Sequence, residues 1–160
     1  MRKHNQTSLI QTNLNMIVVL ALALALITGC RHSSNIQRAA EKGYNFSKLS
    51  AYTISGGDTE GASLTGFEHD TFHNLFVRAA RSALNERGLQ EVNPNDPDAP
   101  QQADMVMRYT LRKTLLITVM DASTRRLIWR GESKREFRAE SMNAELIEAL
   151  VRDILSGFPG

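Results

Sequence analysis

An uninterrupted apolar run near the N-terminus constrains this chain more than any other feature. Residues 16–27 read MIVVLALALALI and contain no polar or charged side chain. A membrane-spanning helix needs roughly 20 such residues, and a core helix that is apolar all round has no face to place in water. A run of twelve apolar residues that follows a basic pair, here Arg2 and Lys3, is instead typical of a secretory signal peptide. The run therefore predicts an exported chain.

The residues after the run indicate which kind of signal this is. Leu26-Ile27-Thr28-Gly29-Cys30 resembles the lipobox of bacterial lipoproteins, in which small residues precede a cysteine. The resemblance implies that the Cys30 thiol receives a diacylglyceryl group, that the chain is cut between Gly29 and Cys30, and that the new amino group is acylated. We therefore expect residues 1–29 to be a lipoprotein signal peptide and Cys30 to be the lipid attachment site.

Cysteine usage and charge agree with this expectation. Cys30 is the only cysteine of the chain, and lipidation would consume a thiol that is otherwise a liability in an oxidising compartment. Removing Arg2 and Lys3 with the signal leaves 17 basic and 17 acidic residues in the mature chain. A general nucleic-acid binder needs a basic excess, so no nucleic-acid partner is expected.

The residue after the cysteine bears on location. In lipoproteins of bacteria with two membranes, an aspartate at this position favours retention in the inner membrane, and here Arg31 follows Cys30. The resemblance thus implies the periplasmic face of the outer membrane. The alternative, for an organism with one membrane, is the outer surface of the cytoplasmic membrane.

The mature chain is expected to consist of a short polar tether, residues 30–43, and one domain, residues 44–160. Apolar spacing, turn residues and prolines place the elements of that domain. We expect a strand near 45–54, a helix over 70–87, an exposed loop over 93–100, a strand over 103–109, a hairpin over 115–137 and a helix over 142–155. This order predicts an α+β two-layer sandwich: a mostly antiparallel sheet of about four strands, with two amphipathic helices on one face.

Several pieces also resemble a family of small bacterial envelope lipoproteins that share a conserved domain of unknown function. They are residues 46–52, 103–109, 117–121 and 127–131, followed by a closing helix that ends in Phe158-Pro159. Members usually carry a long polar, glycine-rich stretch before the hairpin, whereas here Tyr109 reaches Leu115 almost directly. The resemblance implies no catalytic residues.

Two histidines are the candidate metal ligands. His69 and His73 are four residues apart at the start of the helix predicted over 70–87, so their side chains share a face. A catalytic zinc site also needs a third ligand, and the glutamate of the usual helical motif is absent. A half-exposed pair on the first helical turn is the simpler interpretation, so neither a metal nor another cofactor is expected.

The remaining polar clusters have structural interpretations. Six basic residues gather on and after the hairpin and suit anionic headgroups or an acidic partner, but charged strand residues also prevent unwanted edge pairing. They are Arg125, Arg126, Arg130, Lys134, Arg135 and Arg138. Trp129 alternates in phase with Leu127 and is expected in the core. No nucleophile motif appears.

These observations favour a membrane-anchored envelope lipoprotein, a non-enzymatic accessory or scaffold that binds a protein or peptidoglycan partner. One alternative is a metal-binding protein or metal-dependent enzyme that uses His69 and His73. Another is a carrier of a small hydrophobic ligand, with a pocket between sheet and helices.

Overall fold

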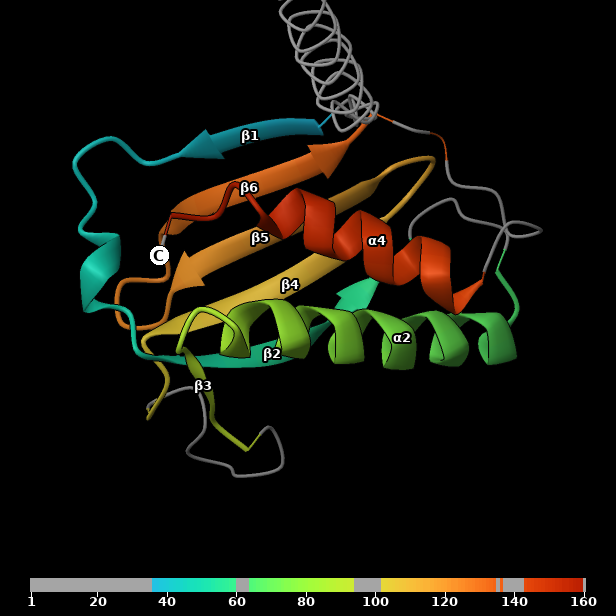
Figure 1. The fold of residues 1–160 in the computed structure, drawn as a ribbon, viewed down its shortest axis with the longest axis horizontal. Coiled ribbons are helices and arrows are strands. Elements are labelled where there is room, and N and C mark those ends of the chain that lie inside the picture. The colour runs from blue at the N-terminus through green and yellow to red at the C-terminus, as the bar shows by residue number, and fades with distance from the viewer. Residues whose placement is uncertain (1–35, 60–63, 94–101, 135, 137–142, 160) are drawn as a thin grey trace, which may run out of the picture. The chain divides into compact units, whose positions relative to one another are not determined.

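The domain is built on one open, mixed sheet. The computed structural model describes residues 36–59, 64–93, 102–134, 136 and 143–159. The strands of this part of the chain are β1 (Ile36–Ala40), β2 (Ala51–Asp58), β3 (Gln90–Glu91), β4 (Met105–Leu111), β5 (Leu115–Asp121) and β6 (Leu127–Ser133). They lie side by side in the order β1-β6-β5-β4-β2-β3 (Figure 1).

The pairing pattern changes across the sheet. Strands β1, β6, β5 and β4 are joined by antiparallel ladders, whereas β4–β2 and β2–β3 are parallel. The parallel half follows from the long helix α2 (Gly66–Asn85), which starts after β2 and returns the chain to the end where β2 began. The expectation of a mostly antiparallel sheet of about four strands was therefore wrong. The sheet is mixed and has six strands in the described residues.

Strand β1 was missed because its sequence carries no strand pattern. Residues 36–40 read IQRAA, and four of the five are exposed. The strand is held by its backbone ladder with β6, from Ile36 opposite Ser133 to Ala40 opposite Trp129. These residues fall within the segment expected to be the tether, and β1 is part of the sheet.

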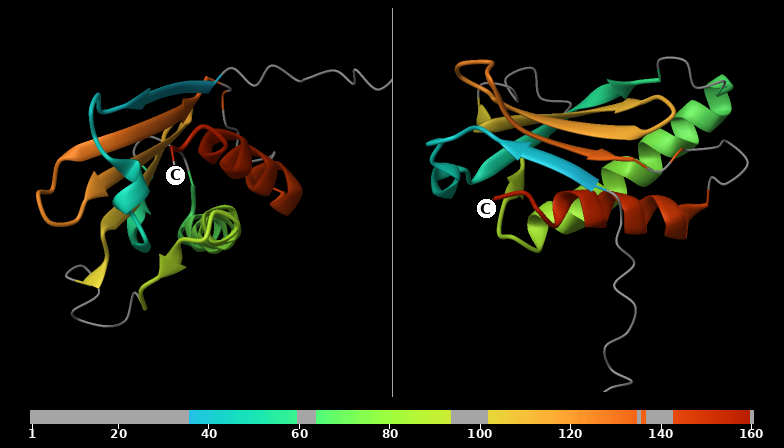
Figure 2. Two further views of the ribbon diagram at one scale, coloured as in Figure 1. Left: turned by 60° about the vertical axis from the view of Figure 1, so that its left-hand side comes forward. Right: turned by 90° about the horizontal axis from the view of Figure 1, so that it is seen from above.

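Both helices cover the same face of the sheet, as Figure 2 shows. Helix α2 begins with a capping box, in which the Thr65 hydroxyl accepts from the Glu68 backbone and the Glu68 carboxylate accepts from the Thr65 backbone. The helix therefore starts four residues before the expected start at Asp70. Gly88, with φ of +80°, lies just beyond its end. The second helix, α4 (Ala144–Leu155), is capped by Asn143. Ser141, another residue able to cap this helix, lies outside the described residues.

The core lies between this helical layer and the sheet. Large side chains with 2 % exposure or less fill it from both sides, including Tyr52, Phe72, Phe76, Tyr109 and Trp129. Trp129 is thus buried as predicted, but Leu127 is half exposed. The ladder between β5 and β6 shifts register between Val119 and Met120, which breaks the simple alternation between Leu127 and Trp129.

Two arginines bind the carboxyl end of α4. Arg38 of β1 donates from Nε to the Ile154 carbonyl at 3.1 Å, and Arg87 donates from a terminal nitrogen to the Leu155 carbonyl at 2.8 Å. Cations are favourable at this end of a helix because its last carbonyls lack intrahelical partners. Arg38 therefore joins the edge strand to the helical layer.

Candidate functional site

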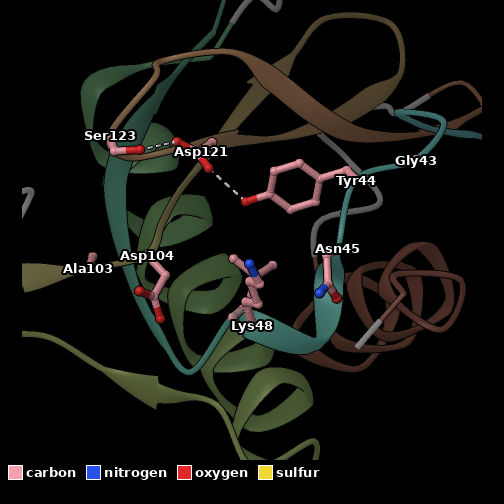
Figure 3. A pocket seen from close by; sticks show the side chains of 9 residues that line it. Gly43, Tyr44, Asn45, Lys48, Ala103, Asp104, Asp121 and Ser123 are labelled. Atoms are coloured by element: carbon pink, nitrogen blue, oxygen red, sulfur yellow. Dashed lines mark hydrogen bonds between the residues drawn. The ribbon is translucent and has the colours of Figure 1, made fainter.

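A polar pocket of about 510 Å³ opens at the end of the sheet where β5 leads into β6. We call this end the pocket end. The pocket is lined by Gly43, Tyr44, Asn45, Lys48, Leu49, Ala103, Asp104, Asp121 and Ser123 (Figure 3). Lys48 belongs to the short 3-10 helix η1 (Phe46–Lys48), and its side chain lies between Asp104 and Asn45 in the figure.

Asp121 organises one wall of the pocket. Its Oδ1 accepts from the Thr124 backbone at 2.7 Å and from the Ser123 hydroxyl at 2.7 Å, and its Oδ2 accepts from the Tyr44 hydroxyl at 2.7 Å. An aspartate that bonds the chain two or three residues ahead is typical of a tight turn. These bonds favour the ionised carboxylate and hold the pKa of Asp121 well below its usual range, with the Thr124 backbone bond contributing most.

Tyr44 is held in its protonated form by the same arrangement. The pKa of Tyr44 is raised to about 12. Partial burial contributes most to this increase, and the hydrogen bond to the Asp121 carboxylate contributes next. The hydroxyl donates to Asp121, so losing its proton would place two negative charges against each other.

Asp104 forms the opposite wall and is bound just as closely. Its Oδ2 accepts from the backbone and the hydroxyl of Ser50, both at 2.8 Å, and from the Ala51 backbone at 2.9 Å. Burial acts to raise the pKa of Asp104, but these hydrogen bonds outweigh it and leave the pKa below its ordinary value. Asp104 thereby joins the start of β2 to the start of β4.

These contacts define what the pocket can do chemically. A general acid or base at neutral pH needs a pKa near 7, and both carboxylates are shifted in the opposite direction. Asp104 and Asp121 are fixed anions whose hydrogen bonds shape the loops around them. The pocket presents this charge and Lys48 to solvent, which suits a polar ligand better than an apolar one.

The two candidate metal ligands, His69 and His73, contact different partners. His73 Nδ1 lies 3.2 Å from the Tyr109 hydroxyl, while His69 Nδ1 lies 3.5 Å from a carboxylate oxygen of Asp70. No group of three or more potential ligands of the His, Cys, Asp and Glu types occurs among the described residues. The spacing of the pair along the helix is as expected, but the structure adds no third ligand.

The basic residues of the hairpin do not form one patch in the part that is described. Arg126 pairs with Glu41, and Arg125 and Arg126 lie in the turn before β6 whereas Lys134 follows its far end. Arg135, Arg138 and Cys30, the expected lipid attachment site, lie outside the described residues, so the structure does not bear on them.

The opposite end of the sheet carries a second group of residues, some exposed and some half-buried. We call it the tether end, because β1 begins there. It comprises Ile36, the β4–β5 turn at Arg112–Thr114, Lys134 after β6, and Phe67 at the start of α2 (right-hand side of Figure 1). Phe67 is 81 % exposed, more than any other large apolar side chain in the described residues.

Neither Tyr44 nor Phe67 was singled out from the sequence. The contact between Tyr44 and Asp121 joins residues 77 positions apart, and no local pattern announces it. Phe67 could have been found by extending the helix upstream. At about 100° per residue it lies opposite Phe76 on the helix, outside the apolar stripe.

No family model and no curated protein matches the sequence. Among solved structures, the fold is similar to that of the PelC dodecamer from Paraburkholderia phytofirmans, at 11 % identity and a TM-score of 0.52, over 76 % of this chain and 94 % of that one. It is also similar to part of a PDZ domain protein from Parabacteroides distasonis, at 10 % identity and a TM-score of 0.54, over 79 % of this chain and 35 % of that one. At these identities the likeness establishes a shared fold.

Proposed function

We propose that this protein is an envelope lipoprotein, held to a membrane by lipid on Cys30, whose domain serves as a non-enzymatic accessory or scaffold for an envelope partner. The observation that carries the proposal is the lipobox, Leu26 to Cys30, directly after a signal-length apolar run. Of the described residues, no helix is both long and apolar enough to cross a membrane.

The position of β1 adds support. Its first residue, Ile36, follows Cys30 by only six positions. Six residues span at most about 20 Å when fully extended. A lipid on Cys30 would therefore hold the folded domain close to the bilayer, which suits a protein that acts at a membrane surface.

The pocket favours a binding role over a catalytic one. Both of its carboxylates accept several hydrogen bonds from within the protein and have lowered pKa values. The proposed partner is a protein or peptidoglycan rather than a nucleic acid, in keeping with the balanced charge of the mature chain. The PelC structure is a dodecamer, so this fold is known to assemble in multiple copies. We include copies of this chain among the partners to be tested.

Incorporation of radiolabelled palmitate tests the anchor. We expect the wild-type chain to be labelled and Cys30→Ser to be unlabelled and to keep its uncleaved signal. Thr28→Ser is the matched control, because it keeps a small residue before the cleavage site and should be labelled normally. Labelling that survives Cys30→Ser would overturn the proposal.

Membrane fractionation tests the location. In a host with two membranes we expect the protein in the outer-membrane fraction and Arg31→Asp in the inner-membrane fraction. Arg31→Lys is the control and should stay with the outer membrane. Crosslinking in intact envelopes followed by pull-down then identifies the partner. A chain that crosslinks neither to another envelope component nor to its own copies would contradict the scaffold role.

A further inference from the structure

We propose that the tether end of the domain rests on the bilayer that anchors the chain, with the Phe67 ring inserted at the boundary between headgroups and acyl chains. This inference rests on the proposed lipid anchor at Cys30. It adds a second contact, made by the folded domain itself, and it gives the domain a definite orientation.

The topology brings the relevant residues to one end. Ile36 lies opposite Ser133, the last residue of β6, and Leu111 lies opposite Leu115 across the β4–β5 turn. The first turns of α2 lie over the end of β4, because Phe72 and His73 both contact Tyr109. Phe67 is the second residue of α2 and comes five residues before Phe72, and the start of α2 lies at this end of the sheet in Figures 1 and 2.

The length of the tether selects this end over the other. The chain from Cys30 to Ile36 reaches at most about 20 Å, and a seven-residue strand such as β6 spans about the same distance. The tether therefore keeps the lipid within about 20 Å of Ile36 at the tether end. The pocket end, where β6 begins with Leu127, lies about one further strand length along the sheet from Ile36.

The helix cap places the Phe67 side chain at the surface. Phe67 is the second residue of α2, and the capping box of Thr65 and Glu68 fixes the first helical turn around it. Its ring is 81 % exposed, whereas Phe72 and Phe76 on the same helix are fully buried. A phenylalanine held in this way fits an apolar surface that approaches from the tether end, and an aromatic ring is well suited to the membrane interface.

The charges around Phe67 indicate that contact with acyl chains, rather than attraction to anionic lipid, drives the docking. Lys113 and Lys134 are exposed at this end, but so are Asp58 and Asp70. Glu132 is also present and accepts from Thr114 at 2.9 Å. Because both signs are represented, we expect docking in neutral and in anionic vesicles alike.

The experiment uses the full mature, lipidated chain. Cys30 is the only cysteine and is consumed by lipid, so Phe67→Cys creates a single site for a bimane label. Leu127→Cys is the matched control, because Leu127 is the other exposed large apolar residue of the described part and lies at the pocket end. Each labelled protein is reconstituted into phosphatidylcholine vesicles, with and without phosphatidylglycerol. Thermal unfolding in detergent confirms that both variants are folded.

We expect aqueous iodide quenching of the label at position 67 to fall by about threefold on reconstitution, because an interfacial group lies 5–10 Å below the surface. Lipid brominated near its headgroup should quench the same label, and the label at position 127 should stay open to iodide. Equal iodide quenching at the two positions would overturn the docking, as would protection of position 67 only in vesicles that contain phosphatidylglycerol.

Mass spectrometry of the purified chain separates this inference from the proposed function. A chain without lipid would overturn both. A lipidated chain whose label at position 67 remains open to iodide would overturn the docking alone and leave the anchor standing.

Discussion

Side chains at the surface are arranged differently at the two ends of this domain. At the pocket end, Tyr44 donates to Asp121, and Asp104 binds the chain around Ser50, so polar groups are directed inward to one another. At the tether end, Phe67 is directed outward while its neighbours complete a helix cap. The side chains at the pocket end are hydrogen-bonded to one another and help to maintain the fold. Phe67 contributes little to the fold and is available for contact with another molecule.

The largest difference in stability should appear between substitutions of two phenylalanines in helix α2. Phe72→Ala should lower the free energy of unfolding by about 3–5 kcal/mol, because it empties a fully buried site. Phe67→Ala should change it by no more than about 0.5 kcal/mol, since the ring contributes little to the folded domain. Urea unfolding of the purified protein measures both. A Phe67→Ala loss comparable to that of Phe72→Ala would remove the distinction between the ends.

A smaller effect is expected at the pocket end. Asp121→Ala should lower the free energy of unfolding by about 2–4 kcal/mol, because it removes a charged acceptor and leaves four donors without their partner. Asp121→Asn keeps one carbonyl acceptor and should lose less. The comparison would fail if Asp121→Ala were as stable as the wild type and altered partner crosslinking instead, because Asp121 would then act in recognition.

Substitution of Arg38 tests how strongly β1 is held to helix α4. Arg38→Ala should cost up to about 2 kcal/mol, since the guanidinium binds the end of α4 in a partly buried geometry. Arg126→Ala is the control. It removes an exposed ion pair with Glu41 and should cost about 0.5 kcal/mol or less. Hydrogen exchange should show faster exchange of β1 amides in Arg38→Ala only.

A further effect, absent at neutral pH, should appear at alkaline pH. The pKa values of Tyr44, Tyr52 and Tyr109 are all raised to about 12, in each case chiefly by burial. Because these folded-state pKa values exceed the unfolded value near 10, the folded chain retains protons that the unfolded chain releases. The free energy of unfolding should therefore be level below about pH 10 and fall as pH rises toward 12.

Phenolate absorbance, followed together with unfolding, measures this change. Tyr44→Phe should reduce the pH dependence of stability. All three tyrosines ionising near pH 10 in the folded protein would contradict the arrangement at both ends, because Tyr44 lies at the pocket end and Tyr109 approaches the tether end.

The local sequence pattern was sufficient to predict an element whose structure depends mainly on its own residues. The helical spacing of Phe72, Phe76 and Ala83 predicted α2, and the turn after Asp121 predicted the β5–β6 hairpin. It was not sufficient for β1, which is held by the backbone of β6. The sequence also left the contacts of Tyr44 open, because its partner is distant along the chain.

By itself the sequence determined the α+β class, both helices, the burial of Trp129 and the prediction of a lipid on Cys30, because each depends on neighbouring residues. Only the tertiary structure decided the mixed order of the sheet, the exposure of Leu127 and the two contrasting ends. Those features arise from pairings between distant segments, whose free energy depends on register, burial and available partners rather than on residue type.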